Sequence, residues 1–399
     1  MPFSNSHAQY GGIAKTFHWL TALLILTLIP LGWFANQLPF GTEAELTRKA
    51  WLFSLHKTLG VTAFFVALLR ILWALGQTKP ALLNGDHRIE SFAAELVHWL
   101  LYGALVIVPL SGWISQAAAA GFAPIWWPFG QGLPLVPKDT GLEHFAGAVH
   151  WVATKLLIFA LFLHIAGALK HHLIDRDATL RRMLPGTPSL PNLPQTPHRQ
   201  LPLFGAVGLW VAVIFLASAF HKGQEHNVVA APALAEVSSQ WQVEQGEISF
   251  TVKQFGNEVT GRFADWTADI TFDADQPNGV VGKVVTTISI RSLTLGSITD
   301  QALGVDFLDG TNHPNAVFDA DISVASDGYE AVGTLTIKEI SVPVRLPFAL
   351  NVQGDSAEMR GDLKLDRQDF GVGHTIKDEA TLGFGVDIKV TLSAVRQGN

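Results

Sequence analysis

Five apolar segments, each long enough to cross a lipid bilayer, constrain the fold of this 399-residue chain more than any other feature. They lie near residues 17–36, 51–75, 93–115, 146–170 and 201–220. A helix needs about 20 residues to cross the hydrocarbon core, where every backbone polar group must be satisfied within the protein. The sequence therefore predicts a multi-pass helical membrane protein with the lipid bilayer as its first partner.

The charges divide the chain into two unlike halves. Residues 1–200 carry 14 Lys+Arg against 9 Asp+Glu, whereas residues 201–399 carry 13 against 25. Because an acidic half is unsuited to binding phosphates, nucleic acid is not an expected partner. The chain contains no cysteine, which excludes disulfides, iron–sulfur clusters and covalently attached c-type haem.

Basic residues predict how the segments are oriented. If the N-terminus is cytoplasmic, the cytoplasmic segments hold Lys15, Arg70, Lys79, Arg88, Lys170, Arg176, Arg181, Arg182 and Arg199, and the opposite loops hold only Arg48, Lys49 and Lys138. This asymmetry follows the positive-inside rule. With five spans, the chain after residue 220 is expected outside the cytoplasm.

Two polar stretches predict the domain boundaries. We expect a four-helix bundle over 1–186, a proline-rich linker over 187–200, a fifth transmembrane helix over 201–220, a tether over 221–235 and a soluble domain over 236–396. The sequence "ALA" at 233–235 resembles a signal-peptide cleavage site. Both an uncleaved tether and cleavage after Ala235 remain open from the sequence.

Four histidines lie within the predicted spans at two matching depths. His150 and His164 bound the fourth span, and the fourteen residues between them place both rings on one helix face, about 21 Å apart. His18 begins the first span and His56 lies near the outer start of the second. Antiparallel helices then place His18 level with His164, and His56 level with His150.

Paired imidazoles in an apolar bundle are typical of haem b, whose iron takes two axial ligands and needs no cysteine. Zinc suits the pattern less well, because it requires three or four ligands and neither level offers a clear third. Ordinary hydrogen bonding between helices is the remaining interpretation of the histidines.

Arg70, fourteen residues after His56, either pairs with haem propionates or extends to lipid headgroups. His98 is either a supporting or quinone-site group or a helix-packing residue.

The last 160 or so residues show a different periodicity. Segments such as "GEISFTVKQF" and "EAVGTLTIKEI" alternate apolar and polar residues and are separated by Gly, Asn and Asp. The pattern predicts an antiparallel β domain that closes into a barrel, and it contains no recognisable metal cluster, nucleophile triad or phosphate loop.

The segments "KTFHWLTALLI", "LHKTLGVTAFFVALLRILWAL", "ELVHWLLYGALVIVPLSGW" and "HWVATKLLIFALFLHIAGALKHH", with the terminal "RRMLPG", resemble the bacterial cytochrome b561 family of four-helix dihaem proteins over residues 10–186. The resemblance implies that His18, His56, His150 and His164 are axial haem ligands and that electrons are exchanged with the quinone pool. Some members are thought to oxidise superoxide at the outer face. The outer loop here contains few cations, which departs from what that substrate requires.

The segments "FTVKQFGNEVTGRFADWTADITFD", "FLDGTNHPNAVFDADI" and "GTLTIKEISVPVRLPFAL" resemble the YceI family of lipocalin-like, isoprenoid-binding barrels. That resemblance implies a long apolar cavity for a polyisoprenoid chain such as that of ubiquinone. A barrel filled by its own side chains is the alternative.

The sequence thus predicts a multidomain membrane protein: a transmembrane dihaem four-helix bundle, a fifth transmembrane helix and a lipocalin-like β-barrel. The preferred function is electron transfer to or from the quinone pool in the bacterial inner membrane, with two haems b per chain, a periplasmic quinone-binding barrel and an unidentified electron donor. The alternatives are a superoxide:quinone oxidoreductase and a membrane-anchored lipid-binding protein without a redox role.

Overall fold

The computed structural model describes residues 2–83, 87–119, 123–186, 188, 200–227, 234–235, 237–273, 276, 279–296, 298–326 and 328–397. The chain forms two compact units. The first comprises Met1–Leu38, Trp51–Ala118 and Ile125–Asn227, and the second comprises Pro39–Ala50, Ala119–Pro124 and Val228–Asn399. Each unit is described separately below.

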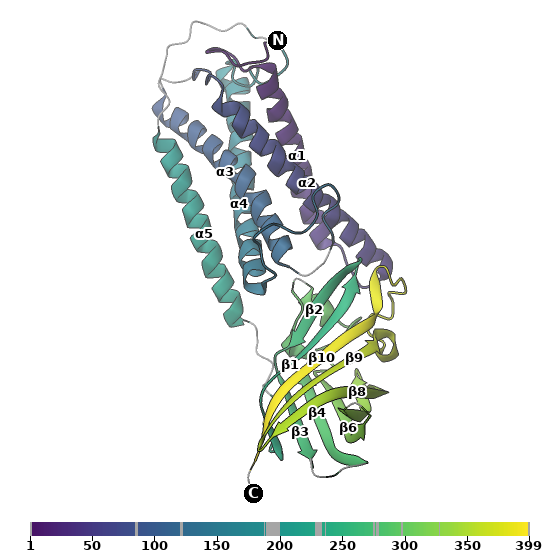
Figure 1. Cartoon of the computed structure of the whole chain (residues 1–399). Helices are drawn as coiled ribbons and strands as arrows, with labels where there is room; N and C mark the ends of the chain where they lie inside the picture. Colours follow the sequence, from purple (N-terminus) through teal and green to yellow (C-terminus); the bar gives the residue numbers. More distant parts are fainter. Residues whose placement is uncertain are drawn as a thin grey trace. The chain divides into compact units, whose positions relative to one another are not determined.

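Five long helices dominate the chain before residue 228: α1 (Gly12–Gln37), α2 (Glu43–Leu75), α3 (Arg88–Ala118), α4 (Thr140–Lys170) and α5 (Leu201–Asn227) (Figure 1). All five are long and apolar enough to cross a membrane, which confirms the predicted spans. Many of their large apolar side chains face outward, as expected for helices whose solvent is lipid. The chain is therefore a membrane protein.

The fifth helix packs against α3 and α4 through one stripe of residues. Ala206, Trp210, Val213 and Ala217 recur at helical spacing, and all four are buried in the core of the bundle. Gly103 of α3 makes room for the indole of Trp210, with which any larger side chain would collide. The helix continues to Asn227, past the expected end at residue 220, and residues 228–233 of the predicted tether and most of the 187–200 linker lie outside the described residues.

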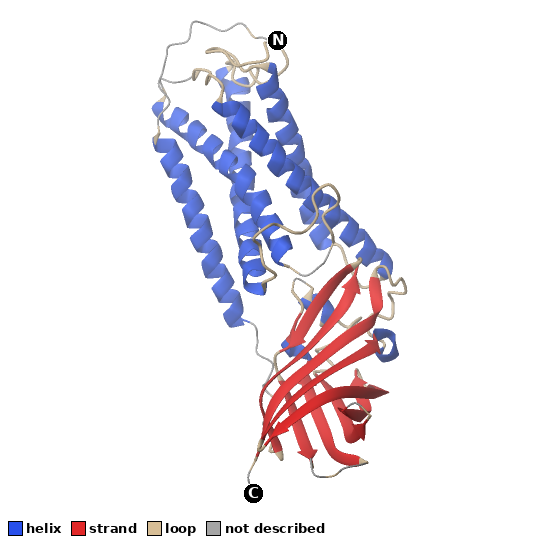
Figure 2. Ribbon diagram, viewed as in Figure 1, coloured by secondary structure: helices blue, strands red, loops and turns tan. Residues whose placement is uncertain are grey.

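The second unit contains ten strands in one antiparallel sheet, shown in red in Figure 2. They are β1 (Trp241–Gln254), β2 (Asn257–Phe263), β3 (Trp266–Phe272), β4 (Val280–Ser289), β5 (Leu293–Thr294), β6 (Asn315–Ala325), β7 (Gly328–Ile337), β8 (Ile340–Gln353), β9 (Ser356–Asp366) and β10 (Leu382–Arg396). Their order is β3-β4-β6-β7-β8-β9-β10-β1-β2-β5. Within the described residues no hydrogen-bonded ladder joins the edge strands β3 and β5. The predicted β-barrel is therefore a strongly curled half-barrel.

Alternation along the strands gives the half-barrel an apolar inner face. Val344, Leu346 and Phe348 of β8 are buried at every second position, while the residues between them are exposed. Trp241, at the start of β1, is 2% exposed and donates its indole N–H to the carbonyl of Phe272 at 3.1 Å. This bond connects the first strand to the edge strand β3.

Candidate functional site

The first four helices each carry two groups on one face, fourteen residues apart. The pairs are His18 and Gly32 on α1, His56 and Arg70 on α2, His98 and Gly112 on α3, and His150 and His164 on α4. Fourteen residues are close to four helical turns, so the members of each pair share a face about 21 Å apart. We call Gly32, His56, Gly112 and His150 the His56 level, and His18, Arg70, His98 and His164 the His18 level.

At the His56 level, two glycines receive the two histidine rings. A Cβ at Gly32 would lie 2.7 Å from Cε1 of His56, and a Cβ at Gly112 would lie 2.9 Å from Nδ1 of His150. The backbones of α1 and α3 therefore approach the rings more closely than any side chain permits. His56 and His150 also interact electrostatically with each other, as the matching depths predict.

A backbone carbonyl orients the ring of His150. Nδ1 of His150 lies 2.8 Å from the carbonyl oxygen of Val108, four residues before Gly112. The backbone of Leu28, four residues before Gly32, interacts with His56 in the equivalent position, although no described group meets the geometric limits of a hydrogen bond to its Nδ1. A histidine that donates from Nδ1 keeps Nε2 available as a metal ligand.

The His18 level contains three imidazoles instead of the expected two. The ring centroids of His18 and His164 are 6.1 Å apart, and those of His98 and His164 are 5.0 Å apart. Nδ1 of His98 lies 2.6 Å from the carbonyl oxygen of Ala94 in its own helix. The sequence offered no clear third ligand at either level; in the structure α3 places the ring of His98 beside that of His164.

Arg70 adds positive charge to the His18 level. Its guanidinium lies over the ring of Tyr102, 5.3 Å from the centroid, and it interacts electrostatically with His18 and His164. At the His56 level, the ammonium of Lys57 instead donates a 2.6 Å hydrogen bond to Oε1 of Gln116. Both levels therefore carry a cation, and they differ in how it is held: the ammonium of Lys57 is hydrogen-bonded to Gln116, whereas the guanidinium of Arg70 lies over an aromatic ring.

The geometry at the His18 level favours a large flat ligand over a single small ion. Among the described residues, only Glu90, His171 and Asp175 bring three potential ligand atoms within 4.8 Å of one another, and these acidic groups already pair with Lys170. Two imidazoles on opposite sides of one haem iron hold their centroids about 6 Å apart, because each bound nitrogen lies about 2 Å from the metal. The 6.1 Å separation of His18 and His164 fits this arrangement.

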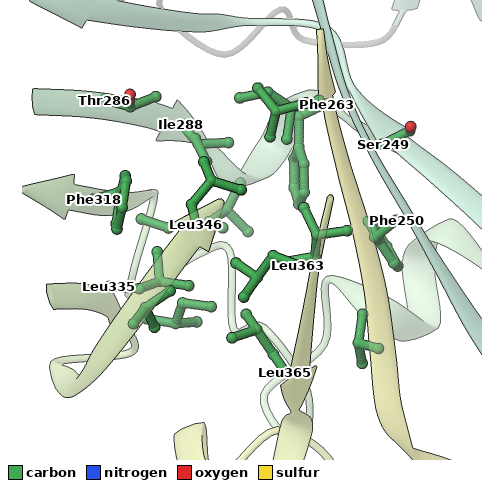
Figure 3. Close-up of a pocket in the computed structure, with 18 of the residues that line it drawn as sticks. Ser249, Phe250, Phe263, Thr286, Ile288, Phe318, Leu335, Leu346, Leu363 and Leu365 are labelled. Carbon is green, nitrogen blue, oxygen red and sulfur yellow. The ribbon is translucent and has the colours of Figure 1, made fainter. Parts of the chain in front are cut away.

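The second unit encloses an apolar cavity of about 300 Å³ inside the curled sheet (Figure 3). Phe318, Leu346 and Leu363 line it from three different strands. The polar exceptions among the lining residues are Ser249, Gln254, Thr286, Gln301 and Arg367. A cavity of this size and lining is typical of a site for a small apolar ligand. The space is therefore not filled by the protein's own side chains.

The lining of this cavity includes buried polar atoms. Oε1 of Gln254 and Nε2 of Gln301 are buried and have no hydrogen-bond partner among the described residues. Arg367 is 4% exposed and donates to the carbonyls of Val372, Gly373, Ile376, Leu382 and Gly383. The guanidinium is thus fully engaged, while the two glutamines offer one acceptor and one donor. The sequence analysis missed both. Gln254 follows Val252 by two residues on β1, so alternation places it on the inner face, whereas Gln301 lies in the short helix α6 (Thr299–Ala302), where strand alternation gives no information.

Two family models match the chain: "Prokaryotic cytochrome b561" over residues 9–186 and "YceI-like domain" over residues 240–394. Cytochrome b561 homolog 2 of Escherichia coli is 31% identical over 46% of this chain and 95% of its own length. A probable superoxide oxidase of Yersinia pestis is 26% identical over 45% of this chain and 97% of its own length.

The second unit has its own relatives. A UPF0312 protein of Pectobacterium carotovorum is 31% identical over 38% of this chain and 81% of its own length. The crystal structure of BcnA from Burkholderia cenocepacia matches 38% of this chain and 96% of its own, with 30% identity and a TM-score of 0.36. The chain therefore belongs to the prokaryotic cytochrome b561 family of b-haem membrane electron-transfer proteins, with a YceI-like domain following the membrane helices.

Proposed function

We propose that this protein is a dihaem cytochrome that exchanges electrons with the membrane quinone pool and holds the quinone tail in its half-barrel. The observation that carries the proposal is the set of two levels, each with a histidine pair drawn from facing helices. Four ligands in two pairs supply two haems with both axial positions.

Each histidine has a defined role in this proposal. His18 and His164 hold one haem, and His56 and His150 hold the other. A bound haem supplies reversible one-electron transfer through its iron. The carbonyl of Val108 fixes the ring of His150, and Gly32 and Gly112 admit the rings of the His56 level to the helix backbones. The apolar helices keep water from both iron positions.

The half-barrel contributes an apolar site for an isoprenoid chain. Transfer of such a chain out of water is favourable by roughly 25 cal/mol per Å² of apolar surface buried. Gln254 and Gln301 offer hydrogen bonds to a polar head group in the cavity. We infer that a long-tailed quinone is carried here and is kept near the membrane by the covalent connection between the units.

The same proposal places the protein in the bacterial inner membrane. The distribution of Lys and Arg puts the N-terminus in the cytoplasm and the half-barrel in the periplasm. A C-terminal alkaline phosphatase fusion should therefore be active, and a C-terminal fluorescent protein fusion that folds only in the cytoplasm should be dark. The reverse pattern would overturn this orientation.

The experiment that tests the function uses the full chain in lipid vesicles. Addition of a short-tailed or a long-tailed quinol should reduce the haems. The reduction is measured from the visible spectrum of the haems. Ala357→Trp fills the cavity, since Ala357 is buried and lines it, whereas Ala349→Trp on the exposed side of β8 is the matched control. We expect Ala357→Trp to slow only the long-tailed reaction. No haem reduction or oxidation by either quinone couple would exclude the proposed function.

A second candidate is quinone-dependent oxidation of superoxide. It is favoured by the similarity to the Yersinia pestis protein named a probable superoxide oxidase. The match covers 97% of the length of that protein. Consumption of superoxide that requires oxidised quinone and both histidine pairs would select this candidate. Consumption at the rate of haem-free protein would eliminate it.

A further inference from the structure

The motif "RRMLPG", residues 181–186, is fastened to the end of α1 that carries His18. Nζ of Lys15 donates to the carbonyls of Leu184 and Gly186, both at 2.8 Å. The indole N–H of Trp19 donates to the carbonyl of Met183 at 2.8 Å, and its ring contacts His18. The motif is therefore a fixed part of the structure beside the His18 level.

Arg182 is the buried cation of this motif. It is 6% exposed, and its Nη1 donates to the carbonyl of Ala81 at 2.9 Å. Nε and Nη2 are also buried, yet no described residue accepts a hydrogen bond from either. Burial lowers the pKa of this guanidinium, the effect expected when a charge is removed from water. A buried donor without an acceptor is unfavourable, so the site favours a ligand that supplies acceptors.

Tyr10 and Tyr102 connect Arg182 to a second cation, Arg70. The Arg182 guanidinium is 5.6 Å from the ring centroid of Tyr10, and Arg70 is 5.3 Å from that of Tyr102. Tyr10 interacts electrostatically with Arg182, Tyr102 and Arg70, which places the four side chains in one cluster. Burial raises the pKa of Tyr10, so its phenol stays neutral at ordinary pH. Within the described residues, neither arginine lies within ion-pair distance of a carboxylate, and Asp177 is the one carboxylate that interacts electrostatically with Arg182 from further away.

We propose that Arg182 and Arg70 form an anion-binding site for the two propionate carboxylates of the haem held between His18 and His164. This inference rests on the proposed function. Two guanidinium groups match two carboxylates in number and charge, and the unmatched N–H groups of Arg182 match their acceptor oxygens. Arg182 is then a positioning residue that also adds positive charge near one haem and not the other.

The test is a potentiometric titration of the full chain, read from the haem spectrum. Arg182→Gln should lower the midpoint potential of the His18-level haem, because a nearby cation favours the reduced iron. The midpoint potential of Arg182→Lys should stay closer to that of the parent protein. Arg181→Gln is the matched control, since Arg181 is the exposed neighbour in the same motif. In a His150→Ala background, which retains only the His18-level haem, the shift should persist. In a His164→Ala background, Arg182→Gln should leave the midpoint potential of the remaining haem unchanged.

The outcomes separate this proposal from the one on which it rests. A parent protein that binds no haem refutes the proposed function. Haem-loaded protein whose His18-level potential is the same in Arg182→Gln and Arg181→Gln overturns the anion site alone. If that unchanged protein also loses co-purifying phospholipid phosphate, the donors of Arg182 belong to a lipid headgroup and the propionate assignment is wrong.

Discussion

The two histidine levels of the bundle are built on one repeat and differ in what surrounds the paired rings. At the His56 level, the two remaining positions are glycines, and the helix backbones touch the imidazoles. At the His18 level, the two positions besides His18 and His164 hold Arg70 and His98. The same fourteen-residue spacing thus produces one site walled by helix backbones, with Lys57 beside His56, and one site that holds Arg70 and a third imidazole.

This difference predicts which of the two haems would be easier to reduce. Nearby positive charge makes a haem easier to reduce, and the His18 level has two guanidinium groups, Arg70 and Arg182, against the one hydrogen-bonded ammonium of Lys57 at the His56 level. We therefore expect the His18-level haem to have the higher midpoint potential. Electrons that enter at the His56 level would then move energetically downhill to the His18 level.

The largest expected effect comes from the ligands themselves. His56→Ala or His150→Ala should each remove one haem of two and spare the other, and His18→Ala or His164→Ala should remove the complementary one. Haem quantification with the reduced spectrum of each variant checks this expectation. If all four variants lose the same spectral component, the assignment of histidines to two levels is wrong.

The glycines of the His56 level should have the next largest effect. Gly32→Ala places a Cβ 2.7 Å from the ring of His56, and overpacking of this kind costs about 1–3 kcal/mol. We expect weaker haem retention at that level only, measured as the rate of haem loss to apomyoglobin. Gly60→Ala is the control, because nothing lies within 4 Å of its added Cβ. Equal haem loss from both variants would contradict a role for Gly32.

Replacement of His98 tests whether this residue is a haem ligand or a supporting group. His98→Leu removes its 2.6 Å bond to the carbonyl of Ala94, which should cost about 1 kcal/mol of stability. Both haems should remain bound, with a small change in the spectrum of the His18-level haem only. A variant with one haem would instead identify His98 as an axial ligand in place of His18 or His164.

The smallest predicted effect concerns the turn before the "RRMLPG" motif. Burial alone would raise the pKa of Asp177, but hydrogen bonds from Thr179 and His171 hold it below the ordinary 3.8. A depressed carboxyl pKa adds stability above pH 4 and loses it as the pH falls through the folded value. Asp177→Asn should therefore cost about 1 kcal/mol at pH 7 and less at pH 3, by thermal denaturation. A cost that does not decrease at low pH would contradict the role of the charge.

Hydropathy and spacing predicted much of the bundle but not all of its contacts. Five apolar segments were sufficient for five helices, because a bilayer allows few other structures. The depths of His18 and His164 followed from helical rise alone. Gly32 and Gly112 were missed, although the same fourteen-residue count from His18 and His98 leads directly to them. Their importance depends on which ring the neighbouring helix presents, and periodicity within one helix does not contain that information.

The β unit shows a similar limit. Alternation predicted antiparallel strands and an apolar inner face, as seen in Val344, Leu346 and Phe348. It did not predict that the edge strands β3 and β5 are not hydrogen-bonded to each other, because closure depends on twist and register along all ten strands.

The most direct test of the account is the haem content of the full-length protein, measured together with its reduced-minus-oxidised spectrum and a potentiometric titration. Two haems b per chain that titrate in two resolved steps are the predicted result. The step at higher potential should disappear in His164→Ala, and the step at lower potential in His56→Ala. A single haem per chain, or two haems that both survive either replacement, would contradict the two-level arrangement.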